Sequence, residues 1–194
     1  MSFEAYDAFE DPYAYPGTTV LKNLLNIRDK GDLEAFEVEI STLRSEEPLP
    51  EGSFDPAHYC SVHRHLFQDV YEWAGRYRTV RTSKGGNAFC YPENIPAQME
   101  GLFSELHRGE VFRNRDRDLF LSEITRFLGE LNAIHPFREG NGRSQLAFVG
   151  LLGAASGHPF DFQTLNREAF MPAMIASYHG NQQPLRVELQ KLLL

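Results

Sequence analysis

The sequence predicts an all-α protein that carries one short β-hairpin. Apolar residues recur at helical spacing along most of the chain, as in Tyr59, Val62 and Leu66. One stretch, residues 76–92, instead places β-favouring residues on both sides of a Gly-Gly-Asn turn. With 42% apolar residues, a chain of 194 residues is long enough to bury a sizeable core, so we expect a single domain over residues 1–194.

The N-terminal third is predicted to hold an arm followed by helices. Residues 1–18 are rich in aromatic residues, acids and proline, and we expect an extended arm whose rings lie over the domain. Helices are predicted over residues 19–26, 33–44 and 55–73. Asp32 is the expected N-cap of the second helix, and Gly75 is expected to end the third. His63 and His65, two residues apart, point to different faces, so the sequence gives no sign of a shared metal.

Residues 76–92 have a different character from the helices around them. Thr79, Val80 and Thr82 favour a strand, and Phe89 begins the return after the turn. Basic residues accompany the strand, at positions 78, 81 and 84. The spacing is equally compatible with a solvated loop that carries a few charges, so from the residues alone both interpretations stay open.

Helices are predicted again over residues 95–108, 119–134, 167–178 and 184–193, with a charged loop over residues 111–118. The helix 119–134 leads directly to His135, and Pro136 must end it because proline lacks an N–H and restricts the residue before it. A second His-Pro-Phe triplet begins at His158, but no glycine nest follows it. We interpret this repeat as a structural turn.

The stretch after His135 has the composition of an anion site. Gly140 and Gly142 flank Asn141, and glycine adopts positive φ without steric cost, so the three backbone N–H groups can point into one concavity. An apolar helix is predicted to start near Gly142 and to end before residue 157, which places this nest on a helix N-terminus. Residues 119–156 therefore read as a helix-loop-helix that presents a phosphate-binding loop.

Three side chains beside the nest fit phosphate chemistry. Arg143, in the first helical turn, has a planar guanidinium that suits phosphate oxygens, and Glu139 offers the hard oxygen that Mg²⁺ prefers. His135, when neutral, can take a proton from an attacking hydroxyl. Taken singly, each has a simpler interpretation as a turn or capping residue. Their order in one loop favours a catalytic site.

Residues 135–143, HPFREGNGR, resemble the signature of the Fic family, H-P-F-x-D/E-G-N-G-R-x-x-R, in its first nine positions. Leu146 stands where that pattern ends in a second arginine. The resemblance implies a helical core with a hairpin flap, and an enzyme that transfers AMP from ATP, with Mg²⁺, to a protein hydroxyl. It assigns His135 as the base, Glu139 as the Mg²⁺ ligand and Arg143 as a β-phosphate contact.

The resemblance also assigns the remaining site residues. The nest Gly140, Asn141 and Gly142 would bind the α- and β-phosphates. The flap would pair with the target's backbone like an added strand, and its expected target-positioning residues are Thr79, Val80, Arg81, Thr82, Ser83 and Lys84. The missing arginine at position 146 would otherwise contact the γ-phosphate or pair with an inhibitory glutamate.

Regulation is implied by the same resemblance. Regulated members carry a Ser/Thr-x-x-x-Glu-Gly/Asn helix, and the nearest match here, Thr42 to Glu46, is followed by Glu47 instead of Gly or Asn. We therefore expect a toxin whose inhibitor is a separate small antitoxin protein with a glutamate-bearing helix. The ATPase subunits of type II topoisomerases are the first targets to test.

Composition limits the other classes of function. A net charge of -8 without a Lys/Arg block disfavours direct nucleic-acid binding. With two cysteines, no signal-like N-terminus and no long apolar run, we expect a cytoplasmic protein that does not span a membrane. Two alternatives to AMP transfer remain: a degenerate Fic fold that only binds, and a Fic enzyme that transfers phosphate, UMP or phosphocholine.

Overall fold

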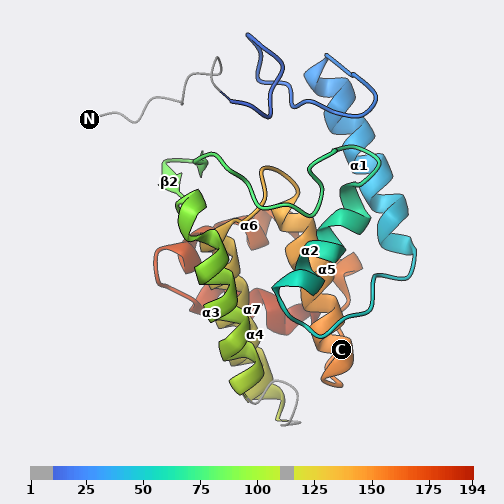
Figure 1. The fold of residues 1–194 in the computed structure, drawn as a ribbon. Helices are drawn as coiled ribbons and strands as arrows, with labels where there is room; N and C mark the ends of the chain where they lie inside the picture. Colours follow the sequence, from blue (N-terminus) through green and yellow to red (C-terminus); the bar gives the residue numbers. More distant parts are fainter. Residues whose placement is uncertain (1–10, 110–115) are drawn as a thin grey trace.

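The computed structural model describes residues 11–109 and 116–194, and within them the protein is helical with one small antiparallel hairpin (Figure 1). Its elements in chain order are α1 (Lys30–Glu46), α2 (Pro56–Phe67), β1 (Ser83–Lys84), β2 (Asn87–Ala88), η1 (Pro92–Asn94), α3 (Ile95–Arg108), α4 (Arg117–Ile134), α5 (Asn141–Ala155), η2 (Phe162–Thr164), α6 (Arg167–Tyr178) and α7 (Gln183–Leu192). The predicted all-α fold class with a short hairpin is confirmed. None of the helices in the described part is both long and apolar enough to cross a membrane.

Helix α4 lies at the centre of the fold. It packs against α3, α5, α6 and α7, while α1 lies on the outside against α2 (Figure 1). Buried rings fill the space between α2, α3, α4 and α5: Tyr59 meets Phe137 and Phe148 at centroid distances of 5.3 Å each, and Phe103 meets Phe127 at 5.3 Å. This aromatic core fixes the end of α4 and the start of α5, and thus the loop between them.

Most predicted helices are present with small shifts at their ends. α3 and α6 have the predicted bounds. α5 starts at Asn141, directly after Gly140, the first glycine of the nest. α4 begins at Arg117, two residues early, because the Asp116 carboxylate accepts the Leu119 N–H at 2.9 Å. The predicted loop 111–118 is therefore wrong at its end, and its residues 111–115 lie outside the described part.

The predicted helix over residues 19–26 is wrong. Leu21 instead pairs with Ala14 in an isolated antiparallel bridge. The Asn23 side chain then takes both backbone groups of Ile27, with its Oδ1 accepting the N–H at 2.8 Å and its Nδ2 donating to the carbonyl at 2.8 Å. Asn26 adopts positive φ, 56°. Hydrogen bonds from an asparagine side chain to nearby backbone groups compete with helix formation, and here they replace the predicted helix.

The bounds of the next two helices also differ from the prediction. α1 begins at Lys30, and its N-cap is Asp29, not the predicted Asp32. The Asp29 carboxylate accepts a hydrogen bond from the Asp32 N–H at 3.0 Å. α2 ends at Phe67, six residues before the predicted end at Trp73. The later apolar residues stay buried through successive turns, so helical spacing alone could not show where α2 stops.

Within the predicted flap, residues 76–92, only two residues on each side form strand. β1 and β2 pair Ser83 with Ala88 and Lys84 with Asn87 around two glycines. Thr79 and Val80, predicted as strand, are not, because side chains take their backbone groups: the Thr79 N–H donates to the Tyr13 hydroxyl at 3.1 Å. Tyr13 in turn lies edge-on to Trp73, and the first ten residues of the predicted arm 1–18 lie outside the described part.

Candidate active site

His135 closes α4 and is the first residue of the candidate site. It is the C-cap of the helix, and its backbone is left-handed (φ 50°, ψ 63°), a conformation that is uncommon for residues other than glycine. Its N–H still donates to the Leu131 carbonyl at 3.0 Å. The imidazole ring stacks on Phe89 of the flap, with centroids 3.8 Å apart and planes 5° from parallel. The helix end and the flap therefore orient this ring together.

The surroundings of His135 keep its ring neutral. Burial lowers its pKa to about 3, although a hydrogen bond with the Asn132 backbone acts in the opposite direction. The positive charges of Arg78 and Lys84 add smaller lowering effects. Nδ1 is buried without a hydrogen-bond partner among the described residues. A neutral imidazole is the form that accepts a proton, so His135 has the protonation state that a general base needs.

The Asn141 side chain braces the loop between the two helices. Its amide accepts the Phe137 N–H at 3.0 Å and donates to the Phe137 carbonyl at 2.8 Å, and the residue is 2% exposed. This side chain is therefore committed to the loop. Only the backbone N–H of Asn141 remains for the predicted nest.

The glycines on either side of Asn141 meet different surroundings. Gly140 has φ 80°, and a Cβ built on it would lie 2.4 Å from the buried ring of Phe67. A Cβ on Gly142 would meet no atom within 4 Å, so space is open beside the first turn of α5. That turn has no side-chain cap, and the first N–H groups of a helix have no partner within it. The arrangement fits a bound phosphate.

Glu139 is exposed next to this nest, and its carboxylate accepts the Gly140 N–H at 2.9 Å. Among the described residues no group of three or more His, Cys, Asp or Glu side chains is arranged to hold a metal ion. Mg²⁺ does not need such a group, because it is commonly held by one or two carboxylates together with substrate phosphates. The donor set therefore fits Mg²⁺ that arrives with a nucleotide.

His63 holds the loop from behind, a role that sequence spacing did not reveal. Its Nδ1 accepts the Gly75 N–H at 2.9 Å, so Nε2 carries the proton and donates to the Glu139 carbonyl at 3.0 Å. The ring lies 3.7 Å from that of Phe137. Burial lowers the pKa of His63 to about 3, which keeps it neutral in this core position.

Arg143 is anchored to α1. It pairs with the Glu37 carboxylate, donates to Ser41 Oγ at 2.7 Å, and lies 4.8 Å above the Phe67 ring. Glu37 is itself buried and accepts a bond from the Tyr71 hydroxyl. About a third of the Arg143 side chain stays exposed, at 36%. The expected phosphate contact thus has to come from a guanidinium that also ties α5 to α1.

The expected target-positioning residues lie in one segment, but they are not equally available. Ser83 and Lys84 form the exposed strand β1, while the Arg81 guanidinium lies 3.8 Å above the Tyr91 ring. From α6, Tyr178 donates its hydroxyl to the Ala88 carbonyl at 2.5 Å and so holds the other strand. Arg78, one of the three basic residues of the predicted hairpin, is buried and donates to backbone carbonyls, so its guanidinium is not available to a target.

Leu146, the departure from the motif, follows Arg143 by one helical turn and packs partly buried against the core. A leucine has no group that could bond to a phosphate. The site therefore contains one arginine where the resemblance leads one to expect two.

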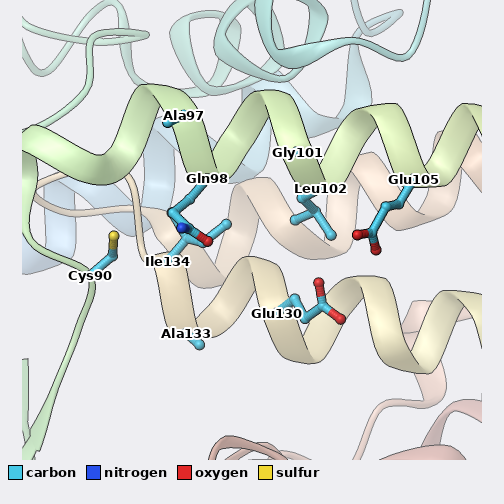
Figure 2. Close-up of a pocket in the computed structure, with 9 residues that line it drawn as sticks. All are labelled: Cys90, Ala97, Gln98, Gly101, Leu102, Glu105, Glu130, Ala133 and Ile134. Carbon is cyan, nitrogen blue, oxygen red and sulfur yellow. The ribbon is translucent and has the colours of Figure 1, made fainter.

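A hollow of about 470 Å³ lies elsewhere, between α3 and α4 (Figure 2). Figure 2 shows Glu105 and Glu130 extending toward each other from the facing helices. Arg126 pairs with both, at 2.7 Å and 3.1 Å. No residue of the motif 135–143 lines this hollow, although the neighbouring Ile134 does. We therefore do not place the active site in it.

The site thus consists of a histidine at the end of one helix and a glycine-rich loop at the start of the next. Comparison with known proteins shows the family to which this arrangement belongs. A profile of the Fic/DOC family matches residues 53–152. The chain is 47% identical to the probable protein adenylyltransferase y4lH of Sinorhizobium fredii, over 97% of this chain and 98% of that one. It is 37% identical to the protein adenylyltransferase VbhT of Bartonella schoenbuchensis, over 91% of this chain and 37% of VbhT.

Solved structures agree with this relationship. The BepC protein of Bartonella tribocorum, solved with bound AMPPNP, superposes with a TM-score of 0.86 at 27% identity, covering 96% of this chain and 98% of that one. The N-terminal Fic domain of a Bep effector protein from Bartonella sp. AR 15-3 also gives 0.86 at 27% identity, over 93% and 90% of the two chains. The chain belongs to the Fic/DOC family.

Proposed function

We propose that this protein is an adenylyltransferase that uses His135 to transfer AMP from ATP to a Ser, Thr or Tyr hydroxyl of a target protein. The enzyme is a nucleotidyltransferase, because its relatives are named protein adenylyltransferases or probable ones, and adenylyl transfer is a nucleotidyltransferase activity. The observation that carries the assignment of roles is the juxtaposition of a neutral, oriented imidazole with an uncapped glycine nest one loop away.

In the proposed reaction, the α- and β-phosphates of ATP lie over the backbone N–H groups of residues 140–142. The target hydroxyl gives its proton to His135 as its oxygen attacks the α-phosphorus. A new oxygen–phosphorus bond forms, the bond from the α-phosphorus to the bridging oxygen breaks, and pyrophosphate leaves. Mg²⁺, held by Glu139 and the phosphates, would supply charge neutralisation. Positioning and electrostatics supply most of the acceleration.

The test is label transfer from [α-³²P]ATP to proteins of a bacterial lysate. We compare the parent chain with His135→Ala and with His158→Ala, which alters the second His-Pro-Phe triplet, where His158 lies 4.6 Å from the Phe120 ring in a structural turn. Loss of the base should lower the rate about a hundredfold or more. Equal labelling by the parent and His135→Ala would refute the assignment of His135.

A donor without a γ-phosphate is the second candidate, and two observations favour it. Leu146 offers no phosphate contact, and the Arg143 guanidinium is partly occupied by Glu37. Competition distinguishes the two: if the γ-phosphate is recognised, ATP binds clearly more tightly than ADP, and if it is not, the two bind alike. If ATP and ADP bind with equal affinity and ATP transfers no label, a different donor or a binding module is favoured.

The partners are part of the proposal. We infer a toxin role in the cytoplasm, with a separate small antitoxin protein as inhibitor and the ATPase subunits of type II topoisomerases as first targets to test. Two observations support this. Cys60 and Cys90 are free thiols, as is usual in a reducing compartment. Large apolar side chains are exposed in α1, at Val38 and Leu43, and in the segment before it, at Leu24 and Leu25. Expression in bacteria should arrest growth with the parent chain and not with His135→Ala. Equal growth would contradict the toxin role.

A further inference from the structure

Arg78 is a fully buried arginine that faces no carboxylate within the described residues. It is 1% exposed, and burial lowers its pKa. A buried charge is costly unless its hydrogen bonds are satisfied. Here every partner is a backbone carbonyl: Nε donates to His135 at 2.8 Å, Nη1 to Val80 at 2.7 Å, and Nη2 to Cys90 at 2.6 Å and to Ile134 at 3.2 Å.

Two of these carbonyls belong to the end of α4. Ile134 is the last helical residue and His135 is its C-cap, so their carbonyls are among those that a helix leaves without partners. A cation at this end also complements the helix dipole. The backbone N–H of Arg78 donates to the Pro136 carbonyl at 2.9 Å, so this one residue holds three successive carbonyls around the left-handed His135.

The other two carbonyls belong to the flap. Val80 precedes β1 and Cys90 follows β2, so Arg78 closes the base of the hairpin. The Cys90 N–H also donates to the Ala133 carbonyl at 3.2 Å, and Figure 2 shows Cys90 beside the end of α4 with Ala133 and Ile134. The segment between carries Phe89, which stacks on the His135 ring.

The phosphate half of the site is held by other residues. The Glu139 carbonyl is bonded to His63, and Arg143 is bonded to Glu37 and Ser41. Arg78 has no hydrogen bond to residues 139–143 among the described contacts. Arg78 therefore holds His135 and the flap, whereas other residues, namely His63, Glu37 and Ser41, hold the phosphate loop.

We propose that Arg78 is a positioning residue of the transfer reaction: it holds the flap and the backbone of His135 in one frame, so that the target hydroxyl meets the base. The inference rests on the proposed function, because it needs His135 as the base. It predicts that losing the guanidinium slows transfer and leaves nucleotide binding intact, a split that a merely structural role would not produce.

The test compares Arg78→Lys and Arg78→Met with Arg76→Met as matched control. Arg76 is exposed two residues earlier and donates to the Glu72 carbonyl of its own segment at 2.7 Å, so its loss removes the same charge. Lysine keeps the charge at position 78 but has no planar fork to bridge both sides. For each variant we would measure AMPPNP binding with Mg²⁺, and the transfer rate from saturating ATP to lysate proteins.

Both Arg78 variants should bind AMPPNP within about twofold of the parent and transfer roughly tenfold to a hundredfold more slowly, because small misplacements of reacting groups cost this much. Arg76→Met should match the parent. Parallel loss of binding and transfer, or failure of both Arg78 variants to fold, would overturn the inference. A folded Arg78→Lys with parental transfer would do so as well. A parent chain without transfer overturns the proposed function, and the inference with it.

Discussion

The two glycines of the nest should respond oppositely to alanine. Gly140 has φ 80°, and an added Cβ would lie 2.4 Å and 2.5 Å from two ring carbons of Phe67, which is fully buried and cannot withdraw. Gly142 lies inside α5 without positive φ, and its Cβ would meet nothing within 4 Å. Position 140 therefore requires glycine both for its backbone conformation and for packing, whereas position 142 requires it for neither.

The size of each effect follows from these contacts. For Gly140→Ala, the left-handed conformation costs about 1 kcal/mol and overpacking against the ring about 1–3 kcal/mol, a loss of roughly 2–4 kcal/mol. In a domain of this size, that lowers the melting temperature by roughly 5–15 °C. Gly142→Ala should raise stability by about 0.5–1 kcal/mol, because alanine is the better helix former.

Thermal and urea unfolding of the two variants, followed by circular dichroism, measures both values. The free energy of unfolding should fall for Gly140→Ala and rise slightly for Gly142→Ala. Equal losses in the two variants, or a Gly140→Ala variant as stable as the parent, would refute the geometry of this loop.

Three further predictions concern the base and Arg143. Because burial lowers the pKa of His135 to about 3, the ring stays neutral as pH falls, so kcat/KM should show no loss near pH 6.5 between pH 8 and about 5; a step at 6.5 would contradict this. Phe89→Ala removes the stacked ring, so transfer should fall roughly tenfold and the pKa of His135 should rise toward its ordinary value, visible as a new acid limb in the same profile. Glu37→Gln breaks the pair with Arg143 and should cost about 1–3 kcal/mol in urea unfolding, whereas the exposed neighbour Glu39→Gln should be neutral; equal stability of the two would contradict the anchor.

The parts of this protein that local sequence determines were predictable. Pro136 ends α4 in any context, and two glycines around Asn141 lead into an apolar helix, so the position of His135 beside a helix start followed from the sequence. The helix α3 carries a strong helical periodicity, and both α3 and α6 have the predicted bounds.

The parts that depend on distant partners were not predictable. The residues 79 and 80 favour strand, but Tyr13 and Arg78 take their backbone groups. The bond from His63 to Glu139 joins residues 76 positions apart, and nothing in the spacing of α2 points to it. Nothing in the sequence distinguished Arg78 from the other basic residues of the hairpin. In the structure it is buried, and its side chain donates hydrogen bonds to backbone carbonyls.

The measurement that tests the central claim most directly is parallel labelling with [α-³²P]ATP and [γ-³²P]ATP, using the purified protein and lysate acceptors. Relative to lysate without the protein, AMP transfer predicts added label on protein from the α-position alone, with the γ-label released as pyrophosphate in equal amount. Both should fall about a hundredfold or more with His135→Ala. Label on protein from the γ-position, or α-label that persists without His135, would contradict the account.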